Sequence, residues 1–132
     1  MIKTSGLDEH IREIHALASD VDEEIQKEMN HIGLQIMSDA RKNTPTQTGT
    51  LKRSFHTDGV EKSGNEYRVE VTNNTEYAAH VEYGHREYVW GRPTGKIRPG
   101  RYMLTNAEKR AKAILPARIK QAIRRAETRI HE

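Results

Sequence analysis

The sequence predicts an α+β fold, and two features of its patterning carry that prediction. Two long stretches with the apolar spacing of helices lie near the two ends, and between them short strand-like runs alternate with turn residues. At 132 residues the chain is long enough for one domain with one core. We therefore expect a single domain over 1–132, with an N-terminal helical segment (1–43), a segment with a sheet, a short helix and a long loop (44–101), and a C-terminal helical segment (102–132).

A long amphipathic helix is predicted from Leu7 to Ala40. Its apolar residues recur at steps of three and four, at Leu7, Ile11, Ile14, Ala18, Val21, Ile25, Met29, Ile32 and Ile36. Ser19 and Asp20 could cap a new helix, so the stretch is either one helix or two with a break near residue 19. Thr44-Pro45 ends it, because the residue before a proline avoids the α region. An unbroken helix would span about 50 Å and would need another subunit to cover its apolar stripe.

The central segment predicts a small antiparallel sheet of about three to four strands. Leu51–Phe55 and Tyr67–Val71 read as strands, the second because apolar and charged residues alternate along it. Turn residues lie between them at Asp58-Gly59 and at Ser63-Gly64-Asn65. One face of this sheet should be buried and the other should face water.

A short helix and a long loop follow the sheet. Tyr77–Tyr83 fits two helical turns closed by Gly84, at a position where a left-handed cap is usual. His85–Arg101 holds three of the nine glycines, two of the four prolines and five Lys/Arg residues. It has no clear period, and we expect a long exposed loop.

The helical period returns from Tyr102 to the end of the chain. Apolar residues recur at Leu104, Ala107, Ala111, Ile114, Leu115, Ile119, Ala122, Ile123, Ala126 and Ile130. Pro116 interrupts this pattern, since proline removes a hydrogen bond and clashes with the preceding turn. We expect a helix that is kinked or broken near Pro116.

The composition narrows the possible functions. Only 34% of residues are hydrophobic, a small supply for a core. The chain has no cysteine, and this excludes disulfides, thiolate metal sites and cysteine nucleophiles. No apolar run approaches the roughly 18 residues needed to span a bilayer, so we expect no membrane partner and a soluble product made in the cytoplasm. Residues 1–66 carry 12 acidic and eight basic side chains, whereas residues 67–132 carry seven acidic and 14 basic ones. The acidic N-terminal and basic C-terminal helices should therefore attract each other, within a subunit or between neighbours.

The sequence offers little support for catalysis. His80, Glu82 and His85 form the nearest approach to a metal cluster, but the histidines are five residues apart and Gly84 should end the helix between them. No nucleophile elbow and no glycine-rich phosphate loop is present. We expect no enzyme, metal or cofactor. A small hydrolase that depends on His80 or His85 is the rival to be tested.

A basic segment with aromatic residues is the strongest candidate for binding. The side chains that we expect to dock onto a partner are Arg86, Tyr88, Trp90, Arg92, Lys96, Arg98 and Arg101. Interleaved cations and rings can also grip a phosphate backbone and stack on bases. A nucleic-acid-binding module that uses this loop and the basic C-terminal helix is therefore the alternative function.

Three short blocks in order resemble a known family. The first block is Ala40-Arg41 with Pro45, Thr48, Gly49, Leu51 and Ser54. The second is Tyr77-Ala78 with Val81-Glu82-Tyr83-Gly84, and the third is Arg101-Tyr102-Met103-Leu104 before a helix. Together they resemble the minor tail-component family of long-tailed, non-contractile bacteriophages and their prophages. The third block departs from the family pattern, because Thr105-Asn106 stands where Pro-Ala is common.

The resemblance implies a structural protein of the phage neck that completes the tail or joins it to the head. Its expected partners are further copies of itself in a ring of six, a connector or head-closure protein, and a tail-tube or terminator protein. Nucleic acid would be only an incidental contact. The resemblance implies an α+β fold without a cofactor, in a protein located in the host cytoplasm before assembly and in the tail or neck of the virion afterwards.

The family-motif residues also have physical interpretations. Pro45 and Gly49 should set the turn from helix to sheet, and Thr48 could hydrogen-bond the backbone of that turn. The side chains of Tyr77, Ala78 and Val81 should pack the short helix on the sheet. Glu82 is harder to explain by packing, and we expect it to bond to backbone or to an arginine.

Overall fold

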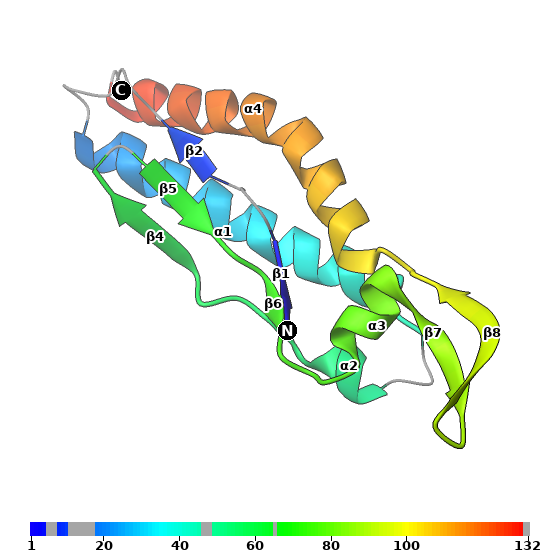
Figure 1. The fold of residues 1–132 in the computed structure, drawn as a ribbon. Coiled ribbons are helices and arrows are strands. Elements are labelled where there is room, and N and C mark those ends of the chain that lie inside the picture. The colour runs from blue at the N-terminus through cyan, green and yellow to red at the C-terminus, as the bar shows by residue number, and fades with distance from the viewer. Residues whose placement is uncertain (5–7, 11–17, 46–48, 65, 131–132) are drawn as a thin grey trace.

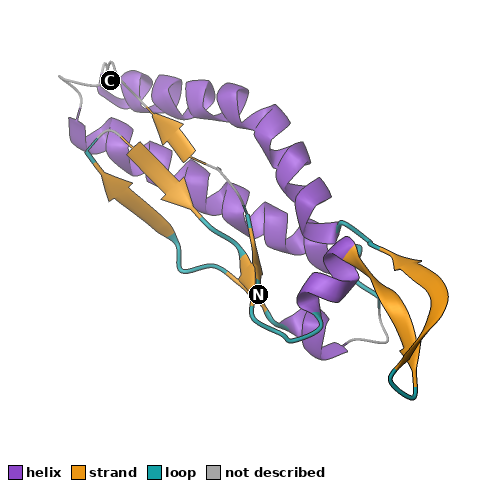
Figure 2. Cartoon of the chain, viewed as in Figure 1, coloured by secondary structure: helices purple, strands orange, loops and turns teal. Residues whose placement is uncertain are grey.

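The computed structural model describes residues 1–4, 8–10, 18–45, 49–64 and 66–130. It has the predicted α+β architecture (Figure 1). Two long helices, α1 (Ala18–Lys42) and α4 (Met103–Ile130), run antiparallel beside each other. Short strands pack along α1, and a two-stranded hairpin projects from the end of the molecule where α4 begins (Figure 2).

Six short strands form two three-stranded antiparallel sheets. The first has the order β1 (Ile2–Lys3), β6 (Thr72–Asn73), β3 (Phe55–His56), and the second has the order β2 (Asp8–His10), β5 (Glu66–Val69), β4 (Val60–Ser63). Each sheet therefore takes its strands from the same three parts of the chain, with β5 and β6 in the middle. Thr4 joins the two sheets, because its N–H donates to the Val71 carbonyl at 3.1 Å and its hydroxyl accepts from the Val71 N–H at 3.2 Å.

The first helix is shorter than the sequence pattern suggested. The prediction of helix from Leu7 is wrong at Asp8–His10, which form β2 and pair with Glu66–Arg68 of β5. The helix expected at residue 7 and at residues 11–17 lies outside the described part of the chain. From Ala18 the helix runs to Lys42, just before Thr44-Pro45, as predicted. At about 37 Å, this helix fits alongside α4.

The apolar stripe of α1 forms the centre of the core. Val21, Ile25, Met29, Ile32 and Ile36 are at most 1% exposed and pack against strand residues and against α4. Gly33 allows α1 to approach the sheet closely, since a Cβ atom there would lie 2.8 Å from Cγ2 of Val69. The same helix therefore buries one face against the sheet and another against α4.

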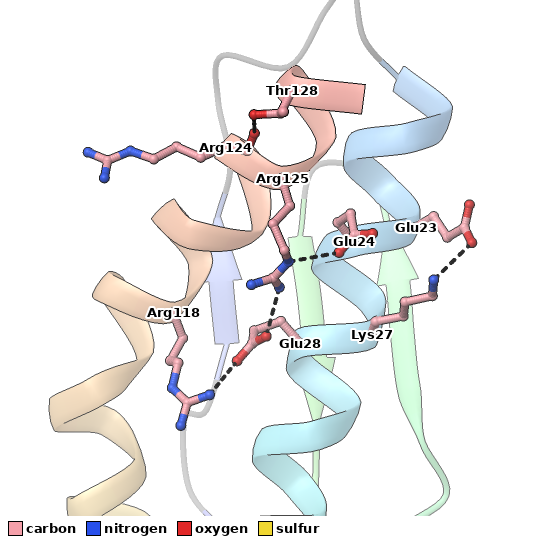
Figure 3. A network of polar contacts seen from close by, with 8 residues as sticks. All are labelled: Glu23, Glu24, Lys27, Glu28, Arg118, Arg124, Arg125 and Thr128. Carbon is pink, nitrogen blue, oxygen red and sulfur yellow. Dashed lines mark hydrogen bonds and ion pairs between the residues drawn. The ribbon is translucent and has the colours of Figure 1, made fainter. Parts of the chain in front are cut away.

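Oppositely charged side chains join α1 and α4 along their edge. Arg125 donates to Glu24 at 3.3 Å and to Glu28 at 3.1 Å, and Arg118 donates to Glu28 at 3.4 Å (Figure 3). Near the start of α4, Arg110 donates to both carboxylate oxygens of Asp39, near the end of α1, at 2.6 and 2.7 Å. The attraction expected between the acidic and basic helices thus operates within one subunit.

The segment after α1 differs from its prediction. Leu51–Phe55 was expected to be a strand, but Gly49–Arg53 form the short helix α2 and only Phe55–His56 form a strand. Leu51 and Phe55 are both buried and are four residues apart, a spacing that places them on one face of a helix as well as of a strand. Period alone therefore cannot separate the two conformations in so short a run. Strand β4, which pairs with β5 through the turn at Gly64, was not predicted either.

The largest correction concerns the expected loop at His85–Arg101. It is a β-hairpin made of β7 (Gly84–Val89) and β8 (Arg92–Pro99). The prediction that this segment is exposed is correct for nearly every residue. Because neither face of the hairpin packs on a core, its sequence lacks the apolar alternation that normally identifies a strand. The short helix α3 (Ala78–Tyr83) precedes it, as predicted.

The C-terminal helix α4 passes through Pro116 as one continuous element. Its buried residues include Met103, Ala107, Ala111, Leu115 and Ile119. The helix follows a curved path (Figure 1), which agrees with the expected kink rather than the expected break.

Candidate interaction site: the hairpin and its base

The β7–β8 hairpin is the most exposed regular structure in the described part of the chain. Tyr88 is 57% exposed, Ile97 is 74% exposed and Trp90, at the tip, is 97% exposed. Large apolar side chains that face water cost free energy when the subunit is alone. Several of them on one projecting element make the hairpin the candidate for an interaction surface.

The tip combines this exposure with backbone strain. Val89 pairs with Arg92, and the two residues between them, Trp90 and Gly91, have φ of 54° and 74°. Positive φ at both central positions is the geometry of a type I′ turn, which favours Asn-Gly. Tryptophan in this conformation costs about 1 kcal/mol or more. The tip therefore combines a strained backbone with an exposed indole ring.

The two faces of the hairpin differ in chemistry. Arg86 lies opposite Ile97 and Tyr88 lies opposite Pro93, and these pairs form a face with aromatic, apolar and basic character. His85 lies opposite Arg98 on the other face, where Arg98 donates to Glu87 at 2.8 Å. The pairing register shifts between Arg86 and Tyr88, whose partners are Ile97 and Pro93. The extra residues lie in β8, where Gly95 has φ of 81°.

Two glycines, Gly84 and Gly100, allow the backbones of the two strands to pass close to each other at the base of the hairpin. A Cβ atom on Gly84 would lie 2.5 Å from the Arg98 carbonyl oxygen, and a Cβ on Gly100 would lie 2.4 Å from the Glu82 carbonyl oxygen. Both contacts are with backbone, which cannot rotate away. Gly84 also has φ of 85°, although its ψ of 171° is not that of the expected left-handed cap. Only glycine fits this crossing at either position.

Glu82 ties the base of the hairpin to α4. The residue is 1% exposed, and its carboxylate accepts hydrogen bonds from the N–H groups of Leu104 at 3.0 Å and Thr105 at 2.8 Å. These donors belong to the first turn of α4, where N–H groups lack partners within the helix and a negative charge is favourable. Of the two partners expected for Glu82, backbone is therefore the one found.

The backbone at this junction is also held firmly. The Glu82 carbonyl accepts from Tyr102 N–H at 3.0 Å, and the Val81 carbonyl accepts from Arg101 N–H at 2.8 Å. Tyr102 has φ of 49°, and with Trp90 it is one of the two non-glycine residues with positive φ that the structure describes. One strained residue thus lies at the base of the hairpin and one at its tip.

An open groove of about 520 Å³ lies beside the base of the hairpin. The residues that line it come from α3, β7, β8 and the adjoining loops: Pro45, His80, Val81, His85, Arg98, Pro99, Gly100 and Arg101. The rings of His80 and His85 stack with centroids 5.1 Å apart and an angle of 20° between their planes. His80, Glu82 and His85 do not converge, because the Glu82 carboxylate points to the start of α4.

The expected docking residues lie on the β7–β8 hairpin and at its base. Arg86 and Tyr88 lie on β7, Trp90 in the turn, Arg92, Lys96 and Arg98 on β8, and Arg101 just before α4. Sequence reasoning assigned none of these positions to a hairpin, and it missed Ile97 and the glycine crossing at Gly100. The closely spaced Pro and Gly residues were the available signal, since turns and bulges need them.

The remaining family-motif residues have structural roles, with two corrections, at Gly49 and Tyr77. Leu51 and Ala78 are buried in the core, and the Ser54 hydroxyl donates to the Thr50 carbonyl at 2.6 Å. Gly49 begins α2, so the chain turns there into a helix rather than into the sheet. Tyr77 was expected to pack on the sheet but is 64% exposed, and its ring makes a T-shaped contact with that of His80. Thr48 lies outside the described residues.

Two negative findings hold for the described part of the chain. No helix there is long and apolar enough to cross a bilayer. No three or more histidine, aspartate or glutamate side chains within the same residues are grouped so that they could hold a metal ion.

Comparison with known proteins identifies the family. Residues 8–84 match the HK97-gp10-like family model, described as "Bacteriophage HK97-gp10, putative tail-component". No curated protein and no solved structure matches the chain. The matched region covers more than half of the chain and ends at Gly84, where the hairpin begins. The chain therefore belongs to the HK97-gp10-like family, whose description is that of a bacteriophage tail component.

Proposed function

We propose that this protein is a tail-completion or head-tail joining subunit of the phage neck, which works as a ring and docks onto the adjoining ring through the β7–β8 hairpin. The observation that carries the proposal is the tip of the hairpin, where Trp90 is 97% exposed and has φ of 54°. Exposed aromatic residues are typical anchors of protein interfaces, where they fill pockets on the partner.

The base of the hairpin supports this reading because it makes the element a fixed projection. Gly84, Gly100 and Glu82 fasten both strands to α3 and α4 through backbone contacts and a buried carboxylate. A pre-organised element loses less conformational entropy on binding than a loose loop does. Docking through the hairpin would therefore not need the ordering step that a long flexible loop would require.

The alternative, a nucleic-acid-binding module, is weakened because part of the basic charge on which it depends is paired within the subunit. Arg110, Arg118 and Arg125 of the basic helix are paired with carboxylates of α1. Their charge is largely neutralised locally, and it adds little to a field that could attract a phosphate backbone. The hairpin keeps its cations, but its exposed apolar side chains favour protein as the partner.

A complementation experiment tests the proposal. A phage that lacks this gene is supplied with the parent protein or with Trp90→Ala, and joined particles, free heads and free tails are counted by electron microscopy. Loss of an anchor residue costs about 2 kcal/mol or more per contact, or about 30-fold in affinity. We expect free heads and tails to accumulate with Trp90→Ala while the purified subunit stays folded.

Leu34→Ala is the matched control, because Leu34 is an apolar residue on α1 that is 50% exposed. It should join particles as the parent does. Normal joining with Trp90→Ala would contradict the proposed role of the hairpin. A salt-sensitive DNA gel shift that disappears with Arg86→Ala and Arg92→Ala would favour the nucleic-acid alternative.

A further inference from the structure

The groove beside the hairpin base has a basic lining. Among the described residues that line it, two are arginines, two are histidines and none is acidic. On the α1–α4 edge, by contrast, arginines pair with carboxylates, as Arg110 with Asp39 and Arg125 with Glu24 and Glu28. The described lining of the groove therefore gathers basic side chains, and Glu87, the acidic partner of Arg98, lies outside it.

The groove arginines are not equivalent. Arg98 already donates to Glu87 at 2.8 Å, outside the groove lining. The Arg101 side chain makes no ion pair or hydrogen bond with any described residue, while its backbone is fixed by the bond to Val81. A guanidinium held on a rigid backbone and left without an acceptor can form a paired hydrogen bond to a carboxylate.

The histidines and the apolar walls complete the site. His80 and His85 present their stacked rings to the groove, and ring N–H groups can donate to an anion. Pro45, Val81 and Pro99 supply apolar walls, which suit a peptide better than a phosphate backbone.

We propose that this groove binds a carboxylate-rich peptide segment of a partner protein, with Arg101 and His85 as the main contacts. The proposal rests on the proposed function, since it supplies a second contact beside the Trp90 anchor on the same docking element. An acidic segment entering the groove would lie next to the hairpin and would fix the rotation of the partner about the tip. The two contacts together would define one orientation, which a single anchor cannot do.

The test uses the free subunit and a tetraglutamate peptide, followed by two-dimensional ¹H–¹⁵N NMR. We expect weak binding, with shifts concentrated at Val81, His85, Arg98 and Arg101. Arg101→Gln should weaken the affinity about three- to tenfold, and His85→Gln should weaken it by a similar or smaller factor. Lys109→Gln, which removes one exposed charge of α4 outside the groove, should leave the affinity within about twofold of the parent.

Three results would overturn the proposal. The first is equal shifts with a tetraglutamine peptide. The second is unchanged tetraglutamate affinity in both groove variants, provided that their spectra otherwise match the parent. The third is tighter binding of inorganic phosphate or a single-stranded DNA 12-mer than of tetraglutamate, which would assign the groove to phosphate. Because the readout is peptide binding in solution, it stays independent of whether Trp90→Ala joins particles.

Discussion

Replacing Glu82 should weaken the whole molecule, because one buried carboxylate connects the hairpin base to the longest helix. The carboxylate accepts from Leu104 at 3.0 Å and Thr105 at 2.8 Å and is 1% exposed. Hydrogen bonds to a charged group contribute about 1.5–3 kcal/mol each. Glu82→Gln keeps one acceptor oxygen but turns a donor toward the second N–H, so we expect a loss of about 1.5–3 kcal/mol. Glu82→Ala also leaves a cavity and should cost about 3–5 kcal/mol.

These losses are large against a total free energy of unfolding of about 5–15 kcal/mol for a domain. For a chain of this size they correspond to Tm decreases of about 5–15 °C for Glu82→Gln and about 10–20 °C for Glu82→Ala. Urea unfolding followed by circular dichroism measures the free energy. Amide hydrogen exchange at Arg101 and Tyr102 reports whether the hairpin base loosens as well.

Glu23→Gln is the matched control for Glu82→Gln. Glu23 is a glutamate on the exposed side of α1, paired with Lys27 at 3.3 Å, and its side chain is 57% exposed. Its replacement should change stability by less than about 0.5 kcal/mol. If Glu82→Gln also stays within that range, the carboxylate does not hold the start of α4 and the argument for a rigid hairpin base fails.

Three further outcomes are expected. Gly100→Ala should destabilise the subunit by about 2 kcal/mol or more in urea unfolding, because the added Cβ would meet the Glu82 carbonyl oxygen at 2.4 Å. Trp90→Asn should stabilise the free subunit by about 1 kcal/mol in the same assay, since asparagine tolerates the φ of 54°, while joining fails. Asp22→Asn should destabilise the protein at pH 7, and the difference should shrink as the pH falls below 3.8.

The sign of the pH effect follows from the surroundings of Asp22. Burial raises the pKa of the Asp22 carboxyl, but hydrogen bonds from Lys62, Tyr67 and Gln26 and the charge of Lys62 outweigh it, so the pKa lies below its ordinary value of 3.8. A lowered pKa stabilises the fold above the unfolded-state pKa, and this contribution disappears as the carboxyl is protonated. A constant difference between Asp22→Asn and the parent from pH 7 to pH 2 would contradict this account.

Gly49→Ala serves as the control for Gly100→Ala. Its added Cβ would meet only the end of the flexible Arg53 side chain, at 3.2 Å. We expect a change near zero, because the side chain can move. A loss as large as that of Gly100→Ala would show that the effect comes from removing any glycine rather than from the backbone crossing.

The helices and the strand whose apolar residues recur at a regular spacing could be predicted from the sequence, because most of those residues face the core. The stripe from Val21 to Ile36, the stripe from Leu104 to Ala126 and the alternation in β5 all face the core, so the residues at fixed spacing had to be apolar. Glycine and proline marked the ends of α1 and α3 for reasons of backbone geometry. The order of the three family blocks was also visible in the sequence, and it led to the family that the comparison shows.

The elements without their own buried face needed the tertiary structure. Asp8–His10 form a strand because β5 offers an edge on which they pair, and the β7–β8 hairpin forms by pairing with itself in water. The role of Glu82 depends on α4, which begins 21 residues later in the chain and brings its free N–H groups to the carboxylate. Local sequence specifies a residue's preference for helix or strand, but such long-range contacts decide which partner satisfies its polar groups. At the candidate site, the base of the hairpin depends on such contacts, from Glu82 to Leu104 and Thr105.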